Sequence, residues 1–193
     1  MIVSWEEPGG PGHVHTARLC LRRPRGEDAL AHHEIHSDPA TNLHNPAGPT
    51  LDPAANAADL ASWRADWARD GIGYWMVRET CDGEVAGVGG VRRAAFDVPV
   101  LNLYYRFRPS AWGRGYAGEV AGAGVEAARA FAPGLPVVAV LRPGNTASRR
   151  VAERAGLVFS RVLDKDGRPS ELYVLDPPDP SPAFHRRPEP PGP

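Results

Sequence analysis

Few features of this 193-residue chain point to a membrane, to secretion or to a disulfide framework. No segment approaches a run of about 18 uncharged apolar residues, and the N-terminus lacks the basic-then-apolar pattern of a signal peptide. The two cysteines, Cys20 and Cys81, are too few for a disulfide scaffold and lack the spacing of a metal site. We therefore expect a cytoplasmic protein with no membrane partner.

An excess of charge of one sign is also missing. The chain has 22 Lys and Arg residues against 23 Asp and Glu residues, and its formal net charge is −1. Without a strong positive charge, nothing steers the chain toward nucleic acid, so we expect no nucleic-acid partner. The length fits a single domain that can bury a substantial core.

The two ends differ in composition from the middle of the chain. Residues 1–15 are rich in glycine and proline and show no hydrophobic period, and residues 177–193 carry repeated prolines. Such segments bury too little apolar surface to offset the entropy lost on ordering. We expect a flexible segment at 1–15, a folded domain at 16–176 and a Pro-rich disordered tail at 177–193.

Hydrophobic periodicity in the middle predicts a mixed α/β sheet of about seven strands with four helices. Asp52 and Pro53 form an N-cap and a first helical residue, and Gly71 ends that helix. Asp82-Gly83 between two apolar runs predicts a hairpin. Strands are expected at 17–22, 74–79, 84–91, 100–107, 137–141, 157–163 and 171–175.

A glycine-rich turn follows the strand at 100–107. Gly113, Gly115 and Gly118 permit left-handed backbone and close approach of a ligand, and the N–H groups of a helix start attract anions. The turn lacks the Gly-Lys-Ser/Thr ending of a P-loop and the downstream acidic residue of a dinucleotide fingerprint. On its own it is either a phosphate site or only a tight corner.

A second motif lies about 20 residues after this turn. Val137–Leu141 is a β-branched run typical of a buried strand, and Asn145 is a good N-cap for the helix that follows. Gly156 stands where a glycine ends that helix. The order is therefore strand, glycine turn, helix, strand, Asn-capped helix and strand.

Together these segments resemble the GNAT N-acetyltransferase superfamily, most closely its RimJ/RimL-type branch. Trp112 to Glu119 matches the branch's Trp-Gly-Lys/Arg-Gly-Tyr-Ala-x-Glu signature, and Asn145 with Ser148 matches its Asn-x-x-Ser motif. The resemblance covers about residues 16–176. It implies a GNAT-like fold and the direct transfer of an acetyl group from acetyl-CoA to a primary amine, with no metal.

The resemblance also implies where acetyl-CoA lies. The pyrophosphate would meet N–H groups at the glycine turn, the pantetheine would run beside the strand that ends at Phe107, and the acetyl group would lie where this strand and Val137–Leu141 separate. Arg108 and Arg114 could bind phosphates or could be surface charges. The implied cofactor-binding residues are Tyr105, Arg106, Phe107, Gly113, Arg114, Gly115, Tyr116, Ala117, Gly118, Asn145 and Ser148.

Candidate proton-transfer groups are few. Many superfamily members use a tyrosine after the second strand, but none lies between Leu141 and Gly156, so Ser148 is the matched catalytic candidate. Ser148 either donates a hydrogen bond to the leaving thiolate or only satisfies helix N–H groups. Glu119 is expected to cap its helix or to order the loop. The loop residues His36, Asp38 and His44 could each accept a proton or simply be solvated.

The absence of an evident strong base bears on the acceptor. An α-amine has a pKa of about 7.7–8.0 and lysine about 10.4, so at pH 7 the neutral α-amine is several hundredfold more available. We expect a peptide N-terminus or a small-molecule amine as acceptor. The alternative is a non-catalytic acyl-CoA-binding sensor or assembly module. The strand beginning at Val100 could support a homodimer, which the sequence leaves open.

Overall fold

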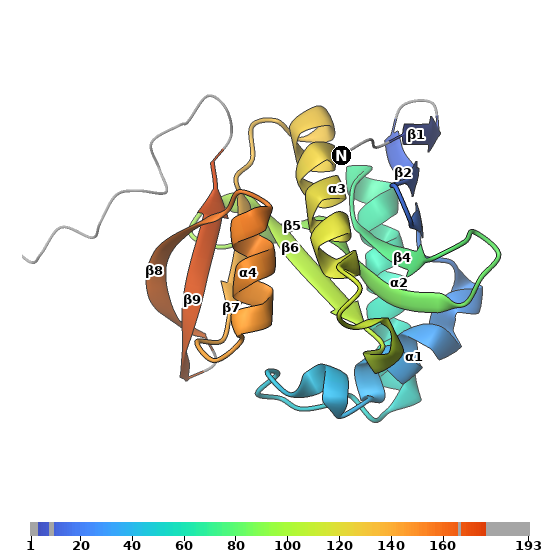
Figure 1. Ribbon diagram of the computed structural model, residues 1–193, viewed down its shortest axis with the longest axis horizontal. Helices are drawn as coiled ribbons and strands as arrows, with labels where there is room; N and C mark the ends of the chain where they lie inside the picture. The colour runs from blue at the N-terminus through green and yellow to red at the C-terminus, as the bar shows by residue number, and fades with distance from the viewer. Residues whose placement is uncertain (1–3, 8–9, 166, 177–193) are drawn as a thin grey trace, which may run out of the picture.

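The computed structural model describes residues 4–7, 10–165 and 167–176 (Figure 1). Its strands form one nine-stranded sheet in the order β1-β2-β3-β4-β5-β6-β7-β9-β8. Within this sheet β6 and β7 run parallel, and the other neighbouring strands pair antiparallel. The strands are β1 (Ser4–Glu7), β2 (Gly10–His15), β3 (Cys20–Arg22), β4 (Tyr74–Arg78), β5 (Val85–Ala95), β6 (Pro99–Phe107), β7 (Val137–Leu141), β8 (Val158–Lys165) and β9 (Arg168–Leu175).

Four α-helices cover the two faces of the sheet, and Figure 1 shows α3 and α4 in front of it with α2 behind. They are α1 (Ala29–Ser37), α2 (Pro53–Asp70), α3 (Tyr116–Phe131) and α4 (Thr146–Arg154). Three short 3₁₀ turns precede or follow them in the chain: η1 (Gly26–Asp28) before α1, η2 (Ala40–Asn42) after α1 and η3 (Pro109–Ala111) before α3. The mixed α/β fold and the four helices predicted from the sequence are confirmed. Among the described residues, no helix has both the length and the apolar character needed to cross a membrane.

Helix boundaries follow from local chemistry. Asp52 caps α2 by accepting a hydrogen bond from the Ala54 N–H at 2.9 Å, and Gly71 ends this helix at φ 67°. Asn145 caps α4 through the Ser148 N–H at 3.0 Å, and Gly156 follows the helix at φ 93°. These four residues act as the sequence predicted.

Each face of the sheet has its own core. On the face covered by α3, Val120 packs so close to β5 that a Cβ at Gly89 would lie 2.9 Å from it, so this approach requires glycine. On the opposite face, Ile35 of α1 and Trp63 of α2 pack with Met76 and Val88 of the sheet. The two cores hold β6 between the helix layers.

The N-terminal segment differs from the expectation. All seven predicted strands are present, but β1 and β2 come from residues 1–15, which we expected to be flexible. The expectation is wrong for residues 4–7 and 10–15, because β2 pairs with β3, Val14 is fully buried and the Trp75 indole N–H donates to the Pro11 carbonyl at 2.7 Å. Because residues 1–15 are rich in glycine and proline, their sequence did not indicate this strand pairing. The Pro-rich tail at 177–193 lies outside the described residues.

The cysteines also differ from the expectation. Cys20 and Cys81 form a disulfide whose Cα atoms lie 5.3 Å apart. Cys20 lies opposite Arg78 in the β3–β4 pair, and Cys81 follows Arg78 closely in the turn between β4 and β5, within reach of Cys20. The two residues are 61 positions apart in sequence, so strand pairing rather than spacing brings them together.

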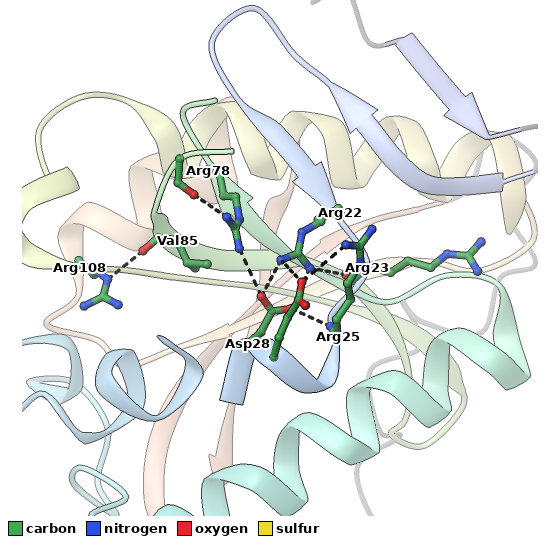
Figure 2. Close-up of polar contacts among 9 residues, drawn as sticks. Arg22, Arg23, Arg25, Asp28, Arg78, Val85 and Arg108 are labelled. Carbon is green, nitrogen blue, oxygen red and sulfur yellow. Dashed lines mark hydrogen bonds and ion pairs between the residues drawn. The ribbon is translucent and has the colours of Figure 1, made fainter. Parts of the chain in front are cut away.

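A buried ion pair fixes the start of α1 to the sheet (Figure 2). Arg22 of β3 binds Asp28 through two hydrogen bonds of 2.8 and 2.6 Å, and the Arg25 N–H donates to the same carboxylate at 2.7 Å. Arg78 of β4 lies 3.5 Å from it. Burial alone would raise the pKa of Asp28, but these donors outweigh burial and lower it, so the carboxylate stays ionised.

Candidate functional site

The two parallel strands at the centre of the sheet separate along their length. β6 and β7 pair at Leu101↔Val137 and Asn102↔Val138. Beyond these pairs β6 continues to Phe107 beside β5, while β7 continues to Leu141 beside β9. The backbone edges that face each other there pair with no strand in the described part of the chain. An extended ligand can bind such edges through main-chain hydrogen bonds.

The glycine turn lies just beyond the end of β6. Gly113 and Gly115 have φ values of 74° and 80°, in the left-handed region that favours glycine, and Gly115 is the N-cap residue of α3. The N–H groups of the first turn of α3 have no intrahelical acceptor and carry the positive end of the helix dipole. A Cβ added at Gly118 would meet no atom within 4 Å, so this turn faces open space. The geometry suits a phosphate group.

Glu119 holds this turn against the loop between β2 and β3. Its carboxylate accepts hydrogen bonds of 2.8 Å from the backbone N–H and from Nε of Arg18, and it also accepts from the Thr16 hydroxyl. Burial would raise the pKa of Glu119, but the donors from Thr16 and Arg18 lower it below its usual value. Glu119 therefore orders the loop and does not cap α3, which fits one of its two predicted roles.

The two arginines considered for phosphate contact are already engaged. Arg114 forms an ion pair with Glu79, with Nη2 and Oε2 2.9 Å apart, and its guanidinium lies 4.8 Å from the centre of the Tyr116 ring. Arg108 donates to the Val85 carbonyl at 2.8 Å (Figure 2) and pairs with a glutamate of α1 at 2.5 Å. Arg108 thus ties β5 to α1, whereas Arg114 stays at the glycine turn.

Across the separation, Ser148 of α4 meets β6. The Tyr105 hydroxyl donates to the Ser148 carbonyl at 3.0 Å, and Ser148 itself is half-buried. Burial raises the pKa of Tyr105 to about 12, although its hydrogen bond with Ser148 acts in the opposite direction. The phenol is therefore protonated at neutral pH. Sequence reasoning treated Tyr105 as a backbone contact and missed that its side chain reaches α4.

On the opposite face of β6, His36 of α1 contacts Tyr104. Its Nδ1 lies 2.8 Å from the His32 carbonyl, which can only accept, so Nδ1 carries the proton and Nε2 accepts from the Tyr104 hydroxyl at 3.1 Å. Burial, followed by the neighbouring His32, lowers the pKa of His36 to about 4. His36 is therefore neutral at physiological pH.

The other two proton-acceptor candidates lie elsewhere. Asp38 accepts a hydrogen bond from the Ala40 N–H at 2.8 Å and so stabilises η2, while His44 is exposed. Of the three, only His36 contacts a tyrosine of β6. The sequence alone could not reveal this, because Tyr104 lies 68 positions from His36.

Comparison with known proteins agrees with this geometry. The profile of the family described as "Acetyltransferase (GNAT) domain" matches residues 18–158, which is most of the chain. The chain belongs to the GNAT acetyltransferase family. The superfamily resemblance predicted from the two motifs is thereby confirmed. A curated relative, the uncharacterized protein YkkB of Bacillus subtilis, is 32% identical over 104 residues. That match covers 53% of this chain and 60% of YkkB.

Solved structures share the fold of this GNAT domain. An acetyltransferase from Agrobacterium tumefaciens has a TM-score of 0.74 and 24% identity, covering 91% of this chain and 98% of that one. RimL, a ribosomal L7/L12 α-N-protein acetyltransferase solved in complex with coenzyme A, has a TM-score of 0.65 and 18% identity over 83% of this chain and 94% of that one.

Proposed function

We propose that this GNAT protein transfers the acetyl group of acetyl-CoA to a primary amine at the separation of β6 and β7. The observation that carries the proposal is the loss of pairing beyond Asn102 next to an open, glycine-lined helix start. It offers an extended pantetheine a backbone edge and offers a pyrophosphate a set of N–H donors. The RimL structure that shares the fold holds coenzyme A, which supports this choice of cosubstrate.

We assign the cosubstrate contacts to the residues implied by the sequence. The N–H groups from Arg114 to Gly118 bind the pyrophosphate, and the backbone of Tyr105 to Phe107 pairs with the pantetheine. Asn145 holds the first turn of α4 in place by accepting the Ser148 N–H. Tyr105 is a positioning residue, because its hydroxyl fixes the same turn against β6.

Acetyl transfer requires balanced bond and proton changes. The amine nitrogen bonds to the acetyl carbonyl carbon, the bond from that carbon to sulfur breaks, the amine loses a proton and the sulfur gains one. We assign to the Ser148 hydroxyl the hydrogen bond that stabilises the leaving thiolate, since Ser148 lies where β6 and α4 meet.

The acceptor is best explained as an amine of low pKa. We place the acceptor on the face of β6 that α1 covers, where His36 contacts Tyr104, but a pKa of about 4 makes His36 a weak base. A lysine amine would need a stronger general base than His36, whereas an α-amine is partly neutral already at pH 7. A peptide or protein N-terminus, or a small-molecule amine of similar pKa, therefore fits this face. The α-N-protein acetyltransferase RimL shares the fold.

A mass-detected assay tests the proposal. The protein is incubated with acetyl-CoA and a panel of N-terminal peptides, N-terminally blocked lysine peptides, polyamines and aminoglycosides. We expect an acetyl group on an α-amine acceptor and little on the blocked lysine peptides. Heat stabilisation by acetyl-CoA without any acceptor-dependent product would favour the non-catalytic binding module. If acetyl-CoA gave no heat stabilisation and no acetylated product, the cosubstrate assignment would be contradicted.

A further inference from the structure

Four potential metal ligands meet near the edge of the sheet that holds β1, β2 and β3. They are His13, His15, Cys20 and Cys81, and one ligand atom from each lies within 4.8 Å of all the others. Nε2 of His13 lies 3.2 Å from Sγ of Cys20 and 3.6 Å from Sγ of Cys81. Nε2 of His15 lies 3.7 Å from Sγ of Cys81. We call these four residues the Cys-His cluster.

The fold explains why the cluster forms. His13 and His15 are two positions apart on β2, so their side chains lie on the same face of the strand, with ring centres 4.9 Å apart. His15 lies directly opposite Cys20 in the β2–β3 pair. Cys81 comes from the turn between β4 and β5. Three separate segments thus supply two nitrogen and two sulfur atoms.

We propose that, once the Cys20–Cys81 disulfide is reduced, the Cys-His cluster binds one Zn²⁺ with tetrahedral geometry. Zinc is bound in structural sites by two cysteines and two histidines at about 2.3 Å for sulfur and 2.0–2.1 Å for nitrogen. In a tetrahedron these bond lengths place a sulfur and a nitrogen roughly 3.5 Å apart. The nitrogen–sulfur distances of 3.2, 3.6 and 3.7 Å already match this value.

The two sulfur atoms must move apart to admit the metal. They part from a bonded contact to about 3.8 Å, the sulfur–sulfur edge of the same tetrahedron. A disulfide by itself requires no histidine, so it does not explain why two imidazoles direct Nε2 at its sulfurs. Four protein ligands leave no open position on zinc, so the site has a structural role and is separate from the acetyl-transfer chemistry.

The conversion of the disulfide form into the zinc-bound form balances in electrons and protons. A dithiol or phosphine reductant supplies two electrons, so the disulfide becomes two thiols while the reductant is oxidised. Zn²⁺ then displaces one proton from each thiol and binds the two thiolates and two neutral imidazoles. Reducing compartments keep thiols free, and oxidising ones favour the disulfide. The sequence leads us to expect a cytoplasmic protein, so we infer that the zinc-bound form is the one present there.

The first test is metal content. The full chain is reduced with a non-chelating phosphine, equilibrated with Zn²⁺, freed of excess metal and analysed for zinc and thiols, with oxidised protein treated in parallel. We expect one Zn²⁺ per reduced chain and none in the oxidised chain. Replacing Zn²⁺ with Co²⁺ should give the intense visible bands of a tetrahedral site and a thiolate-to-cobalt charge-transfer band. Reduced protein without bound metal, or oxidised protein that binds as much, would overturn the proposal.

Variants then test the histidines. His13→Ala combined with His15→Ala leaves both cysteines in place and should weaken Zn²⁺ binding by well over tenfold, since even second-shell changes cost about 10–100-fold. His44→Ala changes an exposed histidine outside the cluster and should bind as the unaltered chain does. Equal zinc affinity in all three proteins would show that the thiols bind zinc without the histidines, which would contradict the proposal. The Co²⁺ spectrum of the unaltered chain stands as a test even if the double variant fails to fold.

Discussion

Two neighbouring tyrosines on β6 face opposite sides of the sheet and contact different helices. Tyr105 donates to Ser148 of α4, and Tyr104 donates to His36 of α1. Burial raises the pKa of both phenols, so both are protonated at neutral pH. Because strand side chains alternate, one short stretch of sequence serves both the cosubstrate side and the acceptor side of the proposed site.

Ser148 offers the most direct test of the leaving-group assignment. Ser148→Ala should lower kcat by about tenfold or more, while the KM for acetyl-CoA changes little, because the hydroxyl is needed when the thiolate forms. Thr146→Ala removes a hydroxyl from the same turn of α4 at an exposed position and should keep kcat. Steady-state kinetics with a saturating acceptor separates the two constants. An unchanged kcat in Ser148→Ala would remove this residue from the mechanism.

His36 allows a prediction about pH. With a pKa of about 4 it is already neutral above pH 5, so its titration cannot shape the rate between pH 6 and 9. For a peptide acceptor, kcat/KM should rise with pH through about 7.7–8.0, the pKa of the α-amine. His36→Gln should lower the rate and leave this midpoint in place. A midpoint near 6.5 that disappears in the variant would instead identify His36 as the base.

At the scale of single elements, the ion pair between Asp28 of η1 and Arg22 of β3 holds the start of α1 against the sheet. Asp28→Asn leaves the buried guanidinium of Arg22 with only the exposed Glu27, 3.8 Å away, as a charged partner, and breaking a buried pair costs about 3–5 kcal/mol. We expect a loss of this size in the free energy of unfolding from urea melts at pH 7. Glu126→Gln breaks an exposed pair with Arg129 and should cost well under about 1 kcal/mol. Similar losses in both variants would contradict this account.

The stabilisation from Asp28 should also depend on pH. Its folded pKa is lowered relative to the unfolded chain, so the contribution is complete above an unfolded pKa of about 3.9. It is lost as the pH falls through the folded value, because Asp28 must then accept a proton. The difference in stability between the unaltered chain and Asp28→Asn should therefore shrink below about pH 4.

Elements bounded by local chemistry were predictable from the sequence. The strand Val137–Leu141 was predicted with its observed ends, and Asp52 and Gly71 bound α2 as expected. The first two strands, β1 and β2, were not predicted, because their pairing depends on partners elsewhere in the chain. Strand propensity is weak without such context.

For the whole molecule, the contacts that shape the site connect distant parts of the sequence. Motif spacing located the glycine turn and α4, where we propose that the cosubstrate binds. The contact of His36 with Tyr104 could not be predicted, since it spans 68 positions. The disulfide spans 61 positions and required the β3–β4 pairing. Side-chain contacts of this kind are set by tertiary packing, which the sequence pattern does not record.

For the molecule as a whole, we propose that acetyl-CoA binds at the β6–β7 separation with its pyrophosphate at the start of α3. Gly118 faces open space there, so Gly118→Glu should fold normally and place a carboxylate beside the pyrophosphate. Gly134 also faces open space but follows α3 at its other end, so Gly134→Glu is the matched control.

Equilibrium binding of acetyl-CoA to the three proteins is the most direct measurement. We predict that Gly118→Glu weakens binding by at least about tenfold, or about 1.4 kcal/mol, while Gly134→Glu binds as the unaltered chain does and all three melt at similar temperatures. Equal affinity in all three proteins would contradict the proposed binding site.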